Sequence, residues 1–203
     1  MKVYSLEEGE KLVKAARYAI ELHIKSPNFN KSIIEHHIEG FNQKHGVFVT
    51  IEHYPTKELR GCIGFIKSMG PIKSSLVDAA IAAASEDPRF VPVSHRELND
   101  ITIEVSILSE PKRLTGTPEE IENSVKIGRD GLIIEYGFYS GLLLPIVAVE
   151  QKWTAREFLE NVCLKAGLSR HMWRQPGVEL YTFTTQVFRE TEPNGSVIEE
   201  NLD

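Results

Sequence analysis

Cysteine is scarce in this sequence: its 203 residues include only Cys62 and Cys163. Residues Met1 to Ile20 form an amphipathic pattern without the apolar core of a signal peptide, so nothing indicates secretion. Disulfides are rare in reducing compartments, and we therefore expect a cytoplasmic protein with two reduced thiols. No stretch approaches the roughly 18 apolar residues of a membrane-spanning helix, which predicts that the protein has no membrane partner.

Positive charge is also in short supply. The sequence has 23 lysines and arginines against 29 aspartates and glutamates, for a formal net charge of -6. Its longest basic cluster is Lys112-Arg113. Non-specific affinity for nucleic acids comes mainly from Lys and Arg side chains that neutralise phosphates. We therefore predict no general nucleic-acid binding, with an affinity for arbitrary duplex DNA weaker than about 10⁻⁵ M at physiological salt.

Several motifs of common catalytic sites are missing. There is no GxxxxGK[ST] phosphate loop, no GxGxxG after a strand, no HExxH, no CxxC and no GxSxG. The adjacent His36 and His37 would point about 100 degrees apart on a helix, which makes them poor partners for one metal ion. The sequence therefore argues against the common cofactor-binding and hydrolase folds, predicts no metal site and leaves any cofactor unknown.

The most informative feature present is the hexapeptide LRGCIG at Leu59–Gly64. On a strand, Arg60 and Cys62 would share one face, and a neighbouring cation lowers the pKa of a thiol. Gly61 and Gly64 remove side chains where a ligand or another backbone segment approaches closely. Two interpretations stay open: Cys62 is a reactive thiol in a binding site, or it is a small core residue, as cysteines commonly are.

Two further charged residues are candidates for the same site. Arg89 follows Asp87-Pro88, where a helix should end because the residue before proline avoids the helical region. Arg89 then either offsets the negative helix end and pairs with Asp87, or holds an anion. Glu104 lies on the polar side of an alternating strand, where it is a general base, a salt-bridge partner for Arg60 or Arg89, or a surface residue.

Periodicity and capping signals predict the secondary structure. Helices are expected to begin near Leu6, at Pro71 and after Thr154. The pairs Ser5/Glu8 and Thr154/Glu157 have the spacing of capping boxes. Strands are expected at about 46–52, 59–64, 101–108, 132–135, 141–149 and 181–188. Because helices and strands do not alternate as βαβ units, we predict an α+β fold with largely antiparallel sheets and flanking helices.

Four local details complete this prediction. Pro145 implies an edge, a bulge or a crossover within the apolar run 141–149. A turn at 128–131 predicts a hairpin. Cys163 lies on an apolar helical stripe, which favours a packing role. From Arg189 onward apolar residues become sparse, and we expect a frayed acidic tail.

Five further runs accompany the hexapeptide: GVFVT at 46–50, DPRF at 87–90, EVSIL at 104–108, GLLLP at 141–145 and CLKAGL at 163–168. With these motifs the sequence resembles the AMMECR family (AMME chromosomal region protein family), whose hallmark is LRGCIG. The resemblance extends over about residues 5–190. Phe65 and Ile146 depart from it, since many relatives have Thr and Gln at these positions.

The resemblance implies two unequal subdomains with a cleft between them. The larger would comprise residues 1–57 and 125–203, and the smaller would be an insert at 58–124. LRGCIG and DPRF would then border the cleft, which is a frequent place for ligand sites. The candidate site residues are Cys62, with a catalytic role in view, and Arg60, Gly61, Gly64, Arg89 and Glu104 as ligand-binding residues.

The resemblance leaves the molecular activity of the family unsettled. Relatives are often encoded near radical-SAM and Memo-like proteins in microbes, which implies a modification pathway. We expect the cleft to bind a small-molecule ligand or a segment of a protein partner within such a pathway. The alternative is an enzyme or carrier in which Cys62 is the nucleophile and Arg60 stabilises an anion. His45 or His53 would then be the base.

Overall fold

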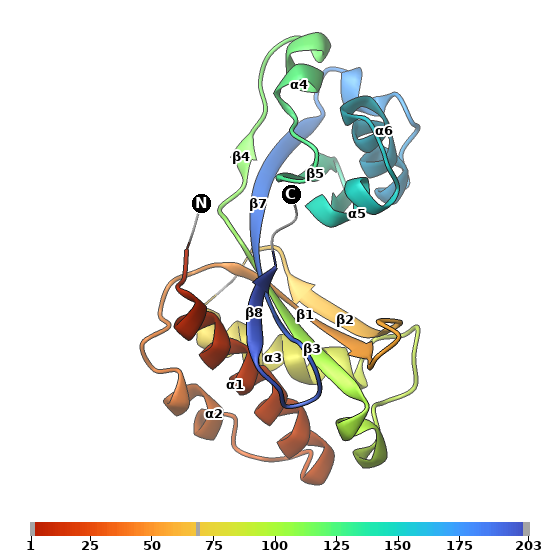
Figure 1. Cartoon of the computed structure of the whole chain (residues 1–203). Coiled ribbons are helices and arrows are strands. Elements are labelled where there is room, and N and C mark those ends of the chain that lie inside the picture. The colour runs from red at the N-terminus through yellow and green to blue at the C-terminus, as the bar shows by residue number, and fades with distance from the viewer. Residues whose placement is uncertain (1–2, 68–69, 201–203) are drawn as a thin grey trace. The chain divides into compact units, whose positions relative to one another are not determined.

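The computed structural model describes residues 3–67 and 70–200 (Figure 1). They fall into two compact units, one with the chain up to Leu108 together with Gln186–Glu200, the other with Ser109–Thr185. This division differs from the predicted insert at 58–124, because the strands at 59–65 and 101–108 both pair with the strand at 46–53. LRGCIG and DPRF therefore both belong to the first unit.

The first unit contains an antiparallel sheet. Its strands are β1 (Gly46–His53), β2 (Leu59–Phe65), β3 (Ile101–Leu108), the end of β7 (Glu179–Glu190) and β8 (Val197–Glu200). Their order is β2-β1-β3-β7-β8, so β2 lies at an edge of the described sheet. β1 pairs antiparallel with both β2 and β3, and β8 pairs antiparallel with β7. These pairings confirm the predicted α+β class.

Helices cover one face of this sheet. α1 (Leu6–Lys25) and α3 (Ile72–Ser85) pack against the strands, and the short α2 (Ser32–His37) packs against both helices (Figure 1). α1 begins at the predicted capping box, in which the Glu8 N–H donates to Ser5 Oγ and the Ser5 N–H donates to Glu8 Oε2. The alternating residues of β1 and β3 that face the helices are buried: Val47, Val49, Ile51, Ile103 and Val105. Within residues 3–67 and 70–200, no helix is both long and apolar enough to cross a membrane.

The second unit has its own sheet and core. β5 (Asp130–Tyr136), β6 (Tyr139–Leu143), β4 (Lys112–Arg113) and the first half of β7 form the order β6-β5-β7-β4. The helices are α4 (Pro118–Ser124), α5 (Pro145–Glu150) and α6 (Ala155–Lys165). α6 begins at the predicted capping box of Thr154 and Glu157, and its apolar stripe of Phe158, Leu159, Val162 and Cys163 is fully buried.

Three local predictions are wrong. Pro145 opens α5 instead of interrupting a strand, because its fixed φ and missing N–H suit the first helical position. The hairpin turn lies at Gly137, where φ is 59°, and joins β5 to β6. The chain after Arg189 continues in β7 and β8, because Glu190 and Val197 are buried in the core; residues 201–203 of the predicted tail lie outside the described range.

Candidate functional site

LRGCIG forms β2, and its pairing with β1 contains a β-bulge. Ile51 faces Gly61 and Glu52 faces Leu59, which leaves Arg60 as the extra residue without a partner in β1. A bulge re-aims a side chain, and the Arg60 guanidinium accordingly finds its polar partners outside the strand. Because of the bulge, simple strand alternation no longer places Arg60 on the same face as the Cys62 thiol.

Arg60 is almost completely buried in contacts with the segment after α3. Its Nε donates to Glu97 Oε1 at 2.7 Å, its Nη2 donates to the Pro92 carbonyl at 3.4 Å, and its guanidinium lies 5.9 Å from the centre of the Phe90 ring. Burial alone would raise the pKa of Glu97, but hydrogen bonds from Arg60 and Ser94 lower it to about 2. Arg60 thus ties β2 to the segment that carries Glu97.

Asp87 and Arg89 hold the backbone of Cys62. The Cys62 N–H donates to Asp87 Oδ2 at 2.9 Å, and Arg89 Nη2 donates to the Cys62 carbonyl at 3.3 Å. Arg89 also donates from Nε to Asp87 Oδ1 at 2.9 Å, which confirms the predicted pairing. The hydrogen bonds from Arg89, helped by the one from Cys62, outweigh burial and hold the pKa of Asp87 well below its usual range. The pair therefore satisfies backbone groups that an edge strand would otherwise leave open.

The two glycines of the motif serve close packing inside the protein. A Cβ on Gly61 would overlap the Ala83 carbonyl oxygen of α3, and a Cβ on Gly64 would overlap the Val47 carbonyl oxygen and the Phe48 ring. The sequence left open whether these glycines make room for a ligand or for another backbone segment. The structure shows backbone atoms beside both glycines.

Four polar residues lie on the face of this sheet opposite α3, and we call them the polar row: Cys62, Thr50, Glu104 and Ser106. Thr50 stands between Cys62 and Glu104 in the register of three neighbouring strands. Its hydroxyl donates to Cys62 Sγ at 3.4 Å, and the Ser106 hydroxyl donates to Glu104 Oε1 at 3.4 Å. Sequence reasoning missed Thr50 and Ser106, although both alternate with the buried apolar residues of their strands.

Burial raises the pKa of the Cys62 thiol above its ordinary value. The hydrogen bond from Thr50 and the charge of Arg89 act in the opposite direction but are outweighed. The predicted lowering of the thiol pKa by Arg60 is therefore wrong, because the positive charge that acts on the sulfur belongs to Arg89 and burial outweighs it. At neutral pH the thiol is protonated.

The histidines considered as bases lie elsewhere. The His45 ring stands edge-on to Tyr4 at a centroid distance of 5.9 Å. His53 is paired with Ile101 at the end of β1, three residues beyond Thr50, and alternation turns its side chain to the other face of the strand. In the described ranges, no group of three His, Cys, Asp or Glu side chains could hold a metal ion.

Glu104 is the unusual acid of the polar row. Burial raises its pKa to about 7, and the charges of Glu52 and Glu200 act in the same direction, against Arg189 and the Ser106 hydrogen bond. Near neutral pH its carboxyl group is therefore present in both protonation states. It can donate or accept a hydrogen bond.

This shift predicts a pH-dependent effect of Glu104→Gln. A raised pKa means that the folded protein disfavours the carboxylate, so wild type loses stability as the pH rises from about 4.5 to about 7. The variant should have a free energy of unfolding about 3 kcal/mol higher than wild type at about pH 8 and a nearly equal one at about pH 4. Urea unfolding at about pH 4 and about pH 8 measures both free energies. If the variant differs from wild type by the same amount at the two pH values, the raised pKa is contradicted.

Cys163 has the packing role that its position predicts. It is fully buried on α6, and its Sγ donates to the Leu159 carbonyl at 3.2 Å. Burial raises the pKa of this thiol as well.

A protein-family model covers most of this chain. The sequence model of the AMMECR1 family matches residues 13–188. The chain belongs to the AMMECR1 family. This AMMECR1-family protein is 49% identical to Protein MJ0810 of Methanocaldococcus jannaschii over 203 residues, which cover 100% of both chains. It is 47% identical to Protein MK0488 of Methanopyrus kandleri over 201 residues, which cover 98% of this chain and 96% of that protein.

A solved structure shares the fold. The crystal structure of Uncharacterized Protein PH0010 from Pyrococcus horikoshii matches with a TM-score of 0.91 and 41% sequence identity, over 99% of this chain and 100% of that one. The names of these AMMECR1 relatives state no activity. A function for this AMMECR1-family protein must therefore be argued from its own side chains.

Proposed function

We propose that the LRGCIG site is a non-catalytic binding site for a small polar ligand or for a segment of a partner protein. The observation that carries the proposal is the polar row, in which a thiol, a hydroxyl and a carboxyl group from three neighbouring strands share one face. The Cys62 thiol in this row is neutral at pH 7, as an ordinary thiol already is, and burial raises its pKa further. The thiolate is the nucleophile, so a neutral thiol favours hydrogen bonding over covalent chemistry.

The donors and acceptors of the polar row indicate the kind of group that it takes. Glu104 can donate or accept near neutral pH, and the hydroxyl of Thr50 can do either, whereas the buried Ser106 hydroxyl is used on Glu104. Amide and hydroxyl groups match such a row. Arg89, whose side chain is 54% exposed, has its charge compensated by Asp87 through hydrogen bonds of 2.9 and 2.7 Å, so it contributes to the site by holding the Cys62 carbonyl rather than by attracting an anion.

We place this binding in the modification pathway that the family resemblance implies. The resemblance implies that genes for radical-SAM and Memo-like proteins lie near those of relatives, so the inferred occupant is a segment of such a partner or the small molecule that the pathway modifies. This part of the proposal rests on association in genomes, and the polar row supports it by offering hydrogen bonds without a nucleophile.

A capture experiment tests the binding role. The full chain is immobilised and offered the purified radical-SAM and Memo-like proteins of the same genome, and small molecules that it retains from a cell extract are released and identified by mass spectrometry. Thr50→Val and Arg89→Ala should each weaken binding of the retained molecule at least tenfold, whereas Cys62→Ser should bind it as well as wild type does. Glu39→Gln, at an exposed position just after α2, is the matched control. Full retention by Thr50→Val would contradict the proposal.

Alkylation separates this proposal from the alternative in which Cys62 is a nucleophile and Arg60 stabilises an anion. We expect iodoacetamide to modify Cys62 before the fully buried Cys163, but more slowly than free cysteine at pH 7, because burial raises the pKa of the Cys62 thiol and so lowers its thiolate fraction. Arg89→Ala should slow the reaction further, and Arg60→Ala should have the smaller effect. Mass spectrometry gives both rates. A Cys62 that reacts faster than free cysteine would favour the nucleophile.

A further inference from the structure

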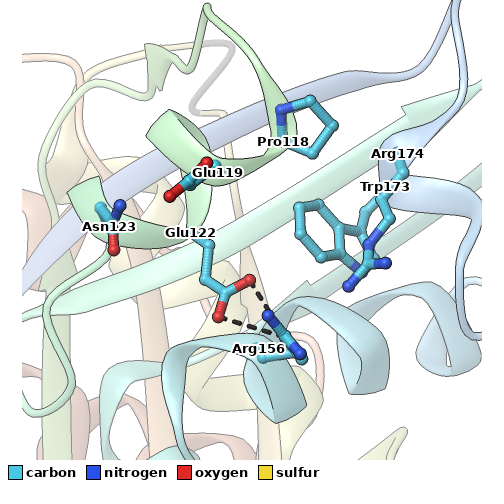
Figure 2. A pocket seen from close by; sticks show the side chains of 7 residues that line it. All are labelled: Pro118, Glu119, Glu122, Asn123, Arg156, Trp173 and Arg174. Atoms are coloured by element: carbon cyan, nitrogen blue, oxygen red, sulfur yellow. Dashed lines mark hydrogen bonds and ion pairs between the residues drawn. The ribbon is translucent and has the colours of Figure 1, made fainter.

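The second unit has two adjacent hollows beside α4 and the 3₁₀ helix Met172–Arg174. Their volumes are about 500 and about 380 Å³, and they share the side chains of Pro118, Trp173 and Arg174. Figure 2 shows the larger one. The smaller one, which we call the Trp173 hollow, is formed by residues 113–116, by Pro118 and Ile121 of α4, and by residues 173–178 with Leu180.

The charges of the larger hollow are largely paired. Arg156 donates from Nε to both carboxylate oxygens of Glu122 at 3.1 and 3.2 Å, as the dashed lines in Figure 2 show. An arginine in this arrangement has its charge compensated by its own carboxylate. The larger hollow therefore offers little attraction to a further anion.

The Trp173 hollow differs in its charge. Two arginines, Arg113 and Arg174, line it, and none of its described lining residues is acidic. Arg113 is paired with Glu179 outside the lining at 2.8 Å. Arg174 makes no ion pair with the described residues, and its guanidinium lies 4.7 Å from the centre of the Trp173 ring, where the cation–π contact orients it. Because Arg113 is paired, Arg174 is the positive charge that this hollow offers to an anion.

The rest of the Trp173 hollow is suited to an apolar body. Leu114, Ile121, Val178 and Leu180 line it together with the Trp173 ring. Trp173 is only 3% exposed, and its Nε1–H is buried without a hydrogen-bond partner among the described residues. Buried donors in folded proteins nearly always have a partner, so this indole can still take an acceptor.

We infer that the Trp173 hollow binds a small organic anion. Its occupant has an aromatic or aliphatic body, which packs on the apolar lining, and one carboxylate or phosphate group, which Arg174 holds. The volume of about 380 Å³ falls in the range of small-molecule pockets. This inference uses no residue of the LRGCIG site and holds or fails independently of the proposed function.

The test follows the two indole N–H signals of the ¹⁵N-labelled full chain, which contains only Trp153 and Trp173; the spectrum of Trp153→Phe assigns them. The probes are phenylacetate and phenyl phosphate, with phenylacetamide as the neutral analogue and inorganic phosphate as the anion without a body. We expect both aromatic anions to shift the Trp173 signal saturably, with a Kd of about 1 mM or below. Phenylacetamide and inorganic phosphate should bind at least tenfold more weakly. A preference between the two aromatic anions identifies the charged group of the natural ligand.

Arg174→Gln should reduce the affinity for both aromatic anions at least tenfold and leave that for phenylacetamide unchanged. Arg174 is exposed, so the variant should fold, and an unchanged thermal unfolding temperature verifies this. Arg156→Gln in the neighbouring hollow is the matched control and should change the affinities less than twofold. Equal binding of phenylacetamide, equal binding of inorganic phosphate, no saturable shift, or an equal loss in Arg156→Gln would each overturn the inference.

Discussion

Glu190→Ala is expected to lower the free energy of unfolding by about 3–5 kcal/mol, because it leaves the buried charge of Arg17 without a partner. Arg17 on α1 donates from Nε and Nη2 to the two carboxylate oxygens of Glu190 on β7. The side chains are 6% and 2% exposed. Arg17 also donates to the carbonyls of Leu98 and Ile101, and the Ile103 N–H donates to Glu190. The pair thus joins α1 to two strands of the sheet.

The matched control for Glu190→Ala is Glu7→Ala, on the same helix as Arg17. Glu7 pairs with Lys11 at 2.8 Å, but both side chains are more than half exposed, and Glu7→Ala should cost less than about 1 kcal/mol. Arg17→Met combined with Glu190→Leu should recover much of the loss, since an apolar pair leaves no buried charge. Urea unfolding of the four proteins measures these differences. If Glu190→Ala costs no more than Glu7→Ala, the buried pair does not hold α1 to the sheet.

Gly61→Ala should destabilise the protein by about 3 kcal/mol. The added Cβ would overlap the Ala83 carbonyl oxygen, which belongs to the backbone of α3 and cannot rotate away as a side chain could. Strand β2 would have to move away from α3. The hydrogen bond from the Cys62 N–H to Asp87, which is 2.9 Å long, should weaken with it.

Gly40→Ala is the control for Gly61→Ala. A Cβ on Gly40 would meet no atom within 4 Å, so this substitution should change the free energy of unfolding by less than about 0.5 kcal/mol. Chemical denaturation compares the two variants. The rate of amide hydrogen exchange at Cys62 is a second measurement. It should increase in Gly61→Ala and stay unchanged in Gly40→Ala. Equal stability of the two variants would show that β2 can shift without cost.

Local patterns predicted most of the secondary structure. The alternation of Val47, Val49 and Ile51 predicted β1, and the capping box of Ser5 predicted the start of α1. These signals work because they depend on neighbours within one turn or one pleat. The last strand escaped prediction, since Val197 and Ile198 form only a short apolar pair in a polar stretch, and Val197 is buried through the pairing of β8 with β7 and its packing against α1.

The candidate site was predicted in part. LRGCIG and DPRF are in contact through the hydrogen bonds of Cys62 with Asp87 and Arg89, but the expected lowering of the Cys62 pKa by Arg60 was wrong. A one-residue bulge redirects a side chain, and only the register of β1 and β2 reveals it. Thr50 and Glu104 meet Cys62 for the same reason, through the pairing of three strands.

The sequence by itself determined the α+β class, the capped helices, the position of the hexapeptide and the buried place of Cys163, because each follows from the order of neighbouring side chains. The tertiary structure alone decided which groups meet: Arg60 with Glu97, 37 residues apart, and Arg17 with Glu190, 173 residues apart. It also decided the direction in which the pKa of the Cys62 thiol shifts, since burial depends on what packs around a side chain. Local sequence contains no information on contacts of that range, and the pKa of a buried group follows from them.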